Sequence, residues 1–453
     1  MPFRKKHPPR HIADATLVID NGAYSIKAGL TSSTSETESV CHTIPNCLGR
    51  ARDKKIWVGS QLEKCKDFGE MAFRRPVEKG FLVNWEAEKE IWEHSFFDKD
   101  AKLKCDPSET NLILTEAPNA PQPLQSNCDQ MVFEDFQFAS YYRCIAPSLN
   151  AYNDIQSIYG APPNPDHSLP EEILLVIDSG FSHTTVTPVL HGRPIQAAIR
   201  RLDIGGKFLT NYLTELVSIR HYHMMDEPHL MNEVKEDVCY VSSDFNADLE
   251  RTWKGAVGDK RRKQERDAGS DNIVLDYVLP DYKTNLRGFA RPHDPSLAAK
   301  RKKLGPSAGA GEVVDDFMTL GNERFTVPEL LFRPGDVQMR QSGLAEVVMQ
   351  SLSVLPGGLW PALLANVVVV GGNAKIKGFV ERLEKELRQL APAECVVRVG
   401  SPSDPVTSTL QGGLTFASSP ATQPALKHVL VTREEYLEHG AGLLKEKFAQ
   451  VPL

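Results

Sequence analysis

The sequence of 453 residues contains no run of about 18 consecutive apolar residues, the length that a helix needs to cross a bilayer. Its longest β-rich run, residues 365–370, is interrupted at once by two glycines. Residues 1–10 are basic, but no apolar segment of the kind found in secretory signals follows them. We therefore expect no contact with membranes and a protein that works in a reducing compartment.

Paired cysteines and metal-binding spacings are missing as well. The eight cysteines are dispersed, without a C-x-x-C pair, and this predicts ordinary thiols rather than disulfides or a zinc site. The tightest group of histidines, His221, His223 and His229, fits no common zinc template. Packing and surface roles explain these side chains better than metal binding does, and we expect no metal-ligating residues.

Nor does one sign of charge dominate the chain. Lysine and arginine number 52 against 59 aspartates and glutamates, which gives a net charge of -7. This balance does not call for a protein that coats nucleic acid, so any contact with DNA must be local. Hydrophobic residues make up 41% of the chain, enough for a sizeable core. The length alone predicts roughly three structural units.

What the chain does contain is an internal repeat. The run L-V-I-D-N-G at residues 17–22 recurs as L-V-I-D-S-G at residues 175–180, which is 158 positions later. A second strand-like stretch follows each run, so both copies predict a β-hairpin with an aspartate and a glycine in its turn. One D-x-G turn is common, but agreement over a six-residue run indicates two related lobes.

Two such hairpins that face each other direct backbone amides and two carboxylates, Asp20 and Asp178, into one gap. Amides in tight turns bind anions, and carboxylates tolerate a polyphosphate only when a divalent cation lies between them. The pair of hairpins therefore predicts a site for a magnesium nucleotide.

A third element supports the same site. The strand-like run at residues 366–370 ends in the paired glycines 371–372, which allow the backbone to approach a flat ring such as adenine. The spacing of apolar residues then predicts a helix over residues 379–390, with Glu384 and Arg388 as one of its i,i+4 ion pairs.

In this order, the three elements resemble the superfold that actin, Hsp70 and sugar kinases share. Further blocks make the chain similar to the actin family in particular. They are V-N-W at residues 83–85, T-E-A-P at 115–118, F-E at 133–134 and G-N-E-R-F at 321–325. The resemblance covers nearly the whole chain. It implies an α/β fold, the actin-like ATPase fold, in which two pseudo-symmetric lobes of mixed β-sheet with flanking helices surround a nucleotide cleft.

The resemblance also implies how the chain divides. Lobe I is expected at residues 1–165 together with 402–453, with a small insert at about 43–75. Lobe II is expected at residues 166–401, with an insert at about 206–330.

The resemblance further implies the residues that would hold ATP or ADP with Mg²⁺. They are Asp20, Asn21, Gly22, Lys27, Asp178, Ser179, Gly180, Gly206, Lys235, Glu236, Gly371 and Gly372. Both hairpins depart from the actin pattern. Ala23 and Tyr24 stand in place of a serine and a glycine, and the lost hydroxyl removes a hydrogen bond to the terminal phosphate worth about 1 kcal/mol. Phe181 stands in place of an acidic residue, which weakens the case for chemistry coupled to Mg²⁺.

Hydrolysis in actin also needs a glutamine and a histidine that place the attacking water. Alignment on residues 133–136 without gaps puts Ala146 and Thr185 at these two positions. Neither side chain places water in the same way. We therefore expect no catalytic residues and a nucleotide that is hydrolysed slowly or not at all.

The long actin loop that contacts the next subunit of a filament is mostly missing. Only four residues separate the run at 49–52 from Trp57. A filament grows only while both complementary patches are present, so we expect no self-polymerisation.

The chain gains a polar, basic loop at about residues 286–316, which includes Arg287, Arg291 and the cluster 300–303. The composition of this loop, with small residues at 305–311, favours a solvated segment. The alternative is a basic arm for DNA, a histone or an acidic segment of a partner. A second basic cluster, residues 260–263 with Arg266, is more typical of a charged helix face.

Among actin-related proteins, the runs at residues 199–207 and 234–242 are similar to those of a nuclear subfamily. That resemblance implies a non-catalytic scaffold subunit of a Swr-type ATP-dependent chromatin-remodelling complex, which exchanges a histone variant into nucleosomes. Its partners would be the remodelling ATPase motor and the other subunits, together with a nucleosome or histone contact. Its location would be the nucleus, and to some extent the cytoplasm. The alternatives are a cytoplasmic actin-related protein that caps filaments and a weak ATPase of the same superfold.

Overall fold

The structure, a computed structural model, describes residues 12–32, 41–162, 169–253, 273–283, 285–296 and 316–449. The basic segments at 1–10, 260–263 with Arg266, and 300–303, and the small-residue run at 305–311, lie outside the described residues. No helix within the described ranges is long and apolar enough to cross a membrane.

The first copy of the repeat forms the centre of a six-stranded sheet. Strand β1 (Ala15–Asn21) pairs antiparallel with β2 (Ser25–Ser32) and parallel with β9 (Thr110–Glu116). The full order is β20-β10-β9-β1-β2-β3, with β20 at Val431–Thr432, β10 at Ser140–Ile145 and β3 at His42–Pro45. The side chains of Leu17 and Val18 belong to different core clusters, so both faces of β1 are covered.

The second copy of the repeat forms the same arrangement. Strand β11 (Ile173–Ser179) pairs antiparallel with β12 (Thr184–Leu190) and parallel with β18 (Val367–Val370). Asp20 lies opposite Lys27 in the first hairpin, and Asp178 lies opposite Thr185 in the second. The repeat in the sequence is therefore a repeat in the structure, and the predicted α/β fold with two related mixed sheets is confirmed.

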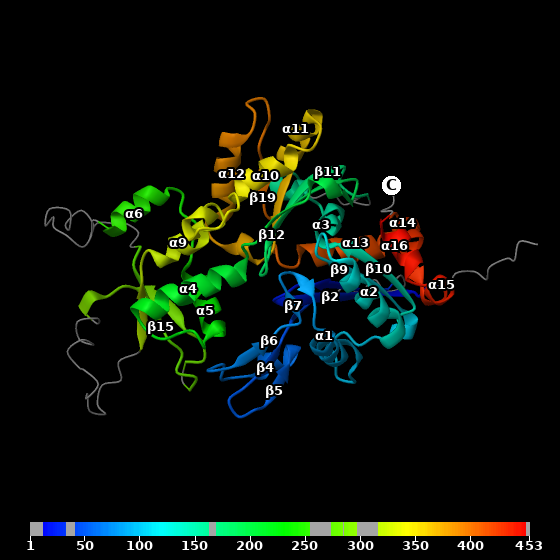
Figure 1. Ribbon diagram of the computed structural model, residues 1–453, viewed down its shortest axis with the longest axis horizontal. Helices are drawn as coiled ribbons and strands as arrows, with labels where there is room; N and C mark the ends of the chain where they lie inside the picture. The colour runs from blue at the N-terminus through cyan, green and yellow to red at the C-terminus, as the bar shows by residue number, and fades with distance from the viewer. Residues whose placement is uncertain are drawn as a thin grey trace, which may run out of the picture.

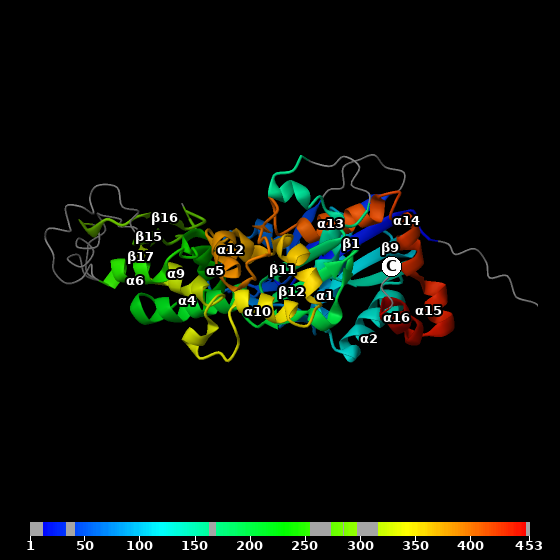
Figure 2. The same ribbon diagram turned by 90° about the horizontal axis from the view of Figure 1, so that it is seen from above.

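Helices cover both sheets (Figure 1). The first sheet packs against α1 (Trp85–Trp92), α2 (Gln122–Gln130), α3 (Ala146–Leu149), α13 (Ser408–Ser418), α14 (Gln423–Val429), α15 (Arg433–His439) and α16 (Ala441–Ala449). The second sheet packs against α4 (Gly206–Arg220), α10 (Leu344–Leu352), α11 (Trp360–Leu364) and α12 (Phe379–Leu390). The helix predicted over residues 379–390 is thus confirmed. Seen from above, the two groups lie side by side along the long axis (Figure 2).

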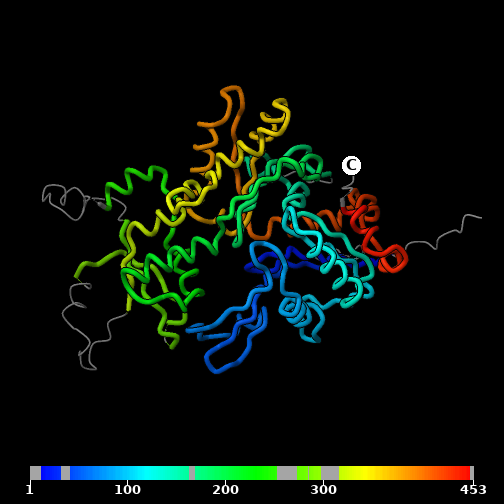
Figure 3. Tube along the Cα trace, viewed as in Figure 1, coloured from blue at the N-terminus to red at the C-terminus, as the bar shows by residue number. Residues whose placement is uncertain are grey.

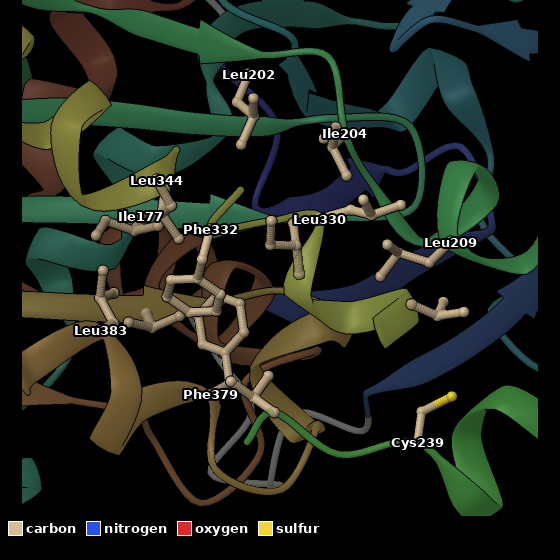
Figure 4. Packing of buried hydrophobic residues seen from close by; sticks show 14 of the residues in the cluster. Ile177, Leu202, Ile204, Leu209, Cys239, Leu330, Phe332, Leu344, Phe379 and Leu383 are labelled. Carbon is tan, nitrogen blue, oxygen red and sulfur yellow. The ribbon is translucent and has the colours of Figure 1, made fainter. Parts of the chain in front are cut away.

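The core under the second sheet shows why α12 lies there. Its residues Phe379 and Leu383 are fully buried and face the same way at helical spacing. In Figure 4 they surround Phe332 together with Ile177 of β11, and the rings of Phe332 and Phe379 lie 5.7 Å apart. Burial of this kind stabilises by about 1.5–3 kcal/mol for each large apolar side chain.

Each sheet carries a smaller insert: in Figure 3 the first, in blue, lies at the bottom and the second, in green, lies at the left. The first insert holds a small sheet of β4 (Leu48–Arg50), β5 (Ile56–Val58) and β6 (Ala72–Arg74). Arg50 pairs directly with Ile56, so only residues 51–55 connect β4 to β5 where actin has its long loop. The second insert holds β15 (Leu275–Val278), β16 (Phe289–Pro292), β17 (Phe317–Leu320), α5 (Pro228–Val238), α6 (Phe245–Trp253) and α9 (Glu323–Glu329).

Candidate functional site

A cavity of about 800 Å³ lies between the two hairpins. This volume is within the range of small-molecule sites, about 300–1,000 Å³. All but one of the residues predicted to hold nucleotide line it: Asp20, Asn21, Gly22, Lys27, Asp178, Gly180, Gly206, Lys235, Glu236, Gly371 and Gly372. The exception is Ser179, which is fully buried behind the lining. The fold therefore brings the predicted residues together, while their role as ligands stays a prediction.

The first hairpin uses both carboxylate oxygens of Asp20. Lys27 Nζ lies 3.1 Å from Asp20 Oδ2, and Thr115 Oγ1 donates to Asp20 Oδ1 at 2.9 Å. Gly22 is required in the turn, because a Cβ there would lie 2.7 Å from the carbonyl oxygen of Ser25 and 2.9 Å from Lys27 Nζ. This close approach keeps the Lys27 ammonium beside the backbone of the turn.

The second hairpin is held from behind by Asn373. Its Nδ2 donates to Ser179 Oγ at 3.1 Å and to the carbonyl oxygen of Gly180 at 3.0 Å. The hydroxyl of Ser179 also lies 2.9 Å from Thr184 Oγ1, so Ser179 fixes the turn. Asp178 faces the cavity. Burial of its carboxyl group, together with the smaller effect of the nearby charge of Asp20, raises the pKa of Asp178 to about 6.

Lys235 and Glu236, on α5, form the wall next to Gly206 at the start of α4. Lys235 is only 5% exposed, and burial lowers its pKa. Its ammonium donates to the carbonyl oxygen of Gly206 at 3.2 Å, to Thr210 Oγ1 at 3.0 Å and to Asn232 Oδ1 at 2.8 Å. Asn232 in turn donates to Glu236 Oε1 at 2.7 Å. This network braces α4 against α5 at the wall of the cavity.

The two residues that align with the water-placing glutamine and histidine of actin also line the cavity. They are Ala146, the first residue of α3, and Thr185 of β12. Ala146 has no polar group in its side chain, and the short hydroxyl of Thr185 cannot span the reach of an imidazole.

His183 is a cavity residue that the sequence reasoning missed. Its Nδ1 is buried without a hydrogen-bond partner among the described residues, and burial lowers its pKa to about 4, so the ring is neutral near pH 7. The ring packs on Gly80, whose φ is +86°, and a Cβ there would lie 2.2 Å from His183 Cε1. His183 lies two residues before Thr185 in the sequence, and this proximity to a candidate site position could have indicated it.

Arg75 is a second residue that was missed. It follows β6 of the small insert and lies against the rings of Tyr24 and Phe181, with its guanidinium carbon 4.7 Å and 5.1 Å from their centres. The two rings, one beside each hairpin turn, lie 5.0 Å apart. These three residues come from three distant segments, so no motif in the sequence indicates the cluster.

The histidines considered for a metal site have other contacts. The ring of His229 stacks on Phe68 with 4.1 Å between centres and 20° between planes, and His223 is exposed. Across the residues that the structure covers, no group of three or more histidine, cysteine, aspartate or glutamate side chains is arranged to hold a metal ion.

Glu88 lies buried behind the first hairpin, and its burial predicts how the stability of the protein depends on pH. Trp92 Nε1 donates to Glu88 Oε1 at 2.9 Å, and burial raises the pKa of Glu88 to about 7. Because this folded pKa lies above the unfolded value, folding takes up a proton, and stability falls as the pH rises toward 7. Glu88→Gln removes the ionisable group, so we expect it to be more stable than the native protein by about 1–3 kcal/mol at pH 8.

Urea unfolding at about pH 5 and pH 8 measures this difference. Glu86→Gln is the matched control, since the Glu86 side chain is 79% exposed on the same helix. An unchanged pH dependence in Glu88→Gln would contradict the assignment.

Comparison with known proteins agrees with this geometry. The family model described as Actin matches residues 13–449. Actin-related protein 6 of Neurospora crassa is 55% identical over 434 residues, which cover 96% of this chain and 94% of that protein. Actin-like protein ARP6 of Yarrowia lipolytica is 38% identical, covering 95% of this chain and 97% of the relative. Actin-related protein 6 of Arabidopsis thaliana is 36% identical, covering 95% and 99%. Sequence, sheet topology and full-length relatives thus agree that the chain belongs to the actin family, in its actin-related protein 6 group.

Proposed function

We propose that this protein is a non-catalytic scaffold that holds an adenine nucleotide between its lobes. The observation that carries the proposal is the lining of the cavity. It contains both hairpin turns, but Ala146 and Thr185 stand where actin has the two residues that place the attacking water. A ligand that binds only the folded form stabilises it, by about 2.7 kcal/mol at a hundredfold excess over its Kd. The nucleotide therefore acts as a part of the core shared by the two lobes.

A steady-state ATPase assay on the pure chain, together with thermal unfolding with and without nucleotide, tests this proposal. We expect a raised Tm with nucleotide and no significant turnover. A rate comparable with that of an actin would overturn the non-catalytic role.

We further propose that the scaffold serves a Swr-type chromatin-remodelling complex in the nucleus, where histone exchange regulates transcription. The relatives reported above carry the name of the actin-related protein 6 group, which is the group whose resemblance implies this placement. The short connection between β4 and β5, where actin has a long filament-contacting loop, also favours it over a filament-forming role. Affinity purification at native expression, followed by mass spectrometry, tests it. We expect a remodelling ATPase among the partners. Recovery of filament proteins without such a motor would favour the cytoplasmic capping alternative.

A weak ATPase is the second candidate, and one observation favours it. His183 brings a neutral imidazole to the cavity beside the second hairpin, and its Nδ1 has no hydrogen-bond partner within the described part of the chain. Slow turnover that His183→Ala abolishes, with unchanged nucleotide affinity, would establish this candidate over the first.

A further inference from the structure

The cavity holds a positive charge that no family motif accounts for. Arg75 contributes its guanidinium to the lining, and no carboxylate of the described residues lies within ion-pair distance of it. Its Nη1 donates to three backbone oxygens at 3.1–3.5 Å, those of Tyr24, Asn46 and Ala23. A guanidinium has five N–H donors in a planar fork, so several remain for an anion.

The residues beside the hairpins do not fit a divalent cation. Both oxygens of Asp20 are already engaged, one by Lys27 and one by Thr115. The position next to the second turn is the aromatic ring of Phe181 rather than a carboxylate. A hard cation such as Mg²⁺ needs oxygen ligands in a near-octahedral arrangement, and among the described residues of the two hairpin turns only the carboxylate of Asp178 has no ion-pair partner.

The same cluster closes one side of the cavity. An adjacent groove of about 1110 Å³ lies between the inserts, and both spaces are lined by Tyr24, Phe73, Arg75, Phe181, His229 and Asn232. These residues therefore form a partition. Tyr24 is held in it by Asn232 Nδ2, which donates to its hydroxyl at 3.3 Å. With 5.0 Å between their centres, the rings of Tyr24 and Phe181 leave no room for a phosphate group between them.

We propose that the cleft takes a nucleoside diphosphate whose negative charge is compensated by Arg75 instead of a divalent cation. This inference rests on the proposed function, since it specifies the ligand of the same cavity. The hairpin amides and Arg75 bind the diphosphate, and the aromatic partition excludes a third phosphate. Charge-assisted hydrogen bonds from Arg75 replace the contacts that a hydrated metal supplies elsewhere.

Calorimetric titration of the nucleotide-free, full-length chain tests the proposal. ADP and ATP are each titrated in excess Mg²⁺ and in excess EDTA. We expect the Kd for ADP to agree within about twofold between the two buffers, and ATP to bind at least about tenfold more weakly than ADP. Arg75→Ala should weaken ADP binding about 10- to 100-fold, the usual worth of a hydrogen bond to a charged group.

Arg74→Ala is the matched control, because the neighbouring Arg74 is 53% exposed and pairs with Glu86 at 2.7 Å outside the cavity. Its ADP affinity should equal that of the native chain. A double variant, Tyr24→Ala with Phe181→Ala, should bring the ATP affinity close to that of ADP. Thermal unfolding of every variant without nucleotide verifies that it is folded.

The outcomes separate the two proposals. ADP binding that is lost in EDTA, or that is unchanged in folded Arg75→Ala, overturns this inference and leaves nucleotide binding intact. If neither ADP nor ATP binds the native chain in either buffer, the proposed nucleotide-holding function fails and the inference fails with it. Should Arg75→Ala not fold, the EDTA comparison on the native chain still decides the role of the metal.

Discussion

Replacing Gly371 by alanine should lower the stability of the protein by about 2–4 kcal/mol and abolish nucleotide binding. Gly371 follows β18 with φ at +91° and ψ at 169°, a region essentially restricted to glycine that costs another residue about 1–3 kcal/mol. A Cβ there would also lie 2.4 Å from the carbonyl oxygen of Ser179 and 2.9 Å from Asp178 Oδ1. Since the obstructing atom is backbone, the second hairpin must move away from the cavity.

The neighbouring glycine supplies the control. Gly372 has no positive φ, and a Cβ there would meet no atom within 4 Å, so Gly372→Ala should keep native stability. Urea unfolding gives the difference in stability, and titration with ADP gives the difference in affinity. Equal stability of the two variants would show that the contact between β18 and the second hairpin tolerates displacement.

Replacing Glu329 by alanine should cost about 3 kcal/mol of stability, because the buried Arg382 loses two charge-assisted hydrogen bonds and keeps Glu386, at 2.6 Å, as its remaining counter-charge. Glu329 is fully buried at the end of α9 and accepts two hydrogen bonds from Arg382 of α12, at 2.8 Å and 3.2 Å. Arg382 is itself only 7% exposed and also donates to the carbonyl oxygen of Ser242. The pair therefore ties the second insert to the sheet of the same lobe.

Two variants separate this effect from a general loss of packing. Arg333, which lies 3.3 Å from the same carboxylate, is 55% exposed, so Arg333→Ala should cost less than about 1 kcal/mol. The double variant Glu329→Leu with Arg382→Met should recover most of the stability, since apolar side chains of similar size replace both charges. Chemical unfolding measures all four proteins. A double variant as unstable as Glu329→Ala alone would contradict the explanation.

The elements that were predictable depend on residues close together in the chain. The D-N-G and D-S-G turns followed their strands in both copies of the repeat, and both hairpins formed. Apolar spacing placed the α12 helix at Phe379–Leu390. The ion pair predicted between Glu384 and Arg388 was wrong, because Arg388 donates to the carbonyl oxygens of Ala391 and Pro392. A long basic side chain near a helix end can pair with a surface carboxylate or donate to the unpaired carbonyl groups of the last turn. Which partner it takes depends on the distances in the folded chain.

The candidate site divides in the same way. The residues of the two hairpin turns and the glycines 371–372 lie together because they stand where strands end at one gap, and α5 brings Lys235 and Glu236 to the same cavity. His183 was missed because it carries no motif of its own, and Arg75 because its neighbours Tyr24 and Phe181 lie far away in the chain.

The sequence by itself determined the repeat, the two hairpins, the glycines of the turns and the membership of the actin family. These features rest on local backbone geometry and on runs of adjacent residues, which a sequence displays directly. Only the tertiary structure decided which charges are paired and where the cavity is closed. Lys27 neutralises Asp20, Glu329 holds Arg382, and Arg75 faces the cavity without a carboxylate among the described residues. Such pairings depend on distances of a few ångströms between segments that the fold alone brings together.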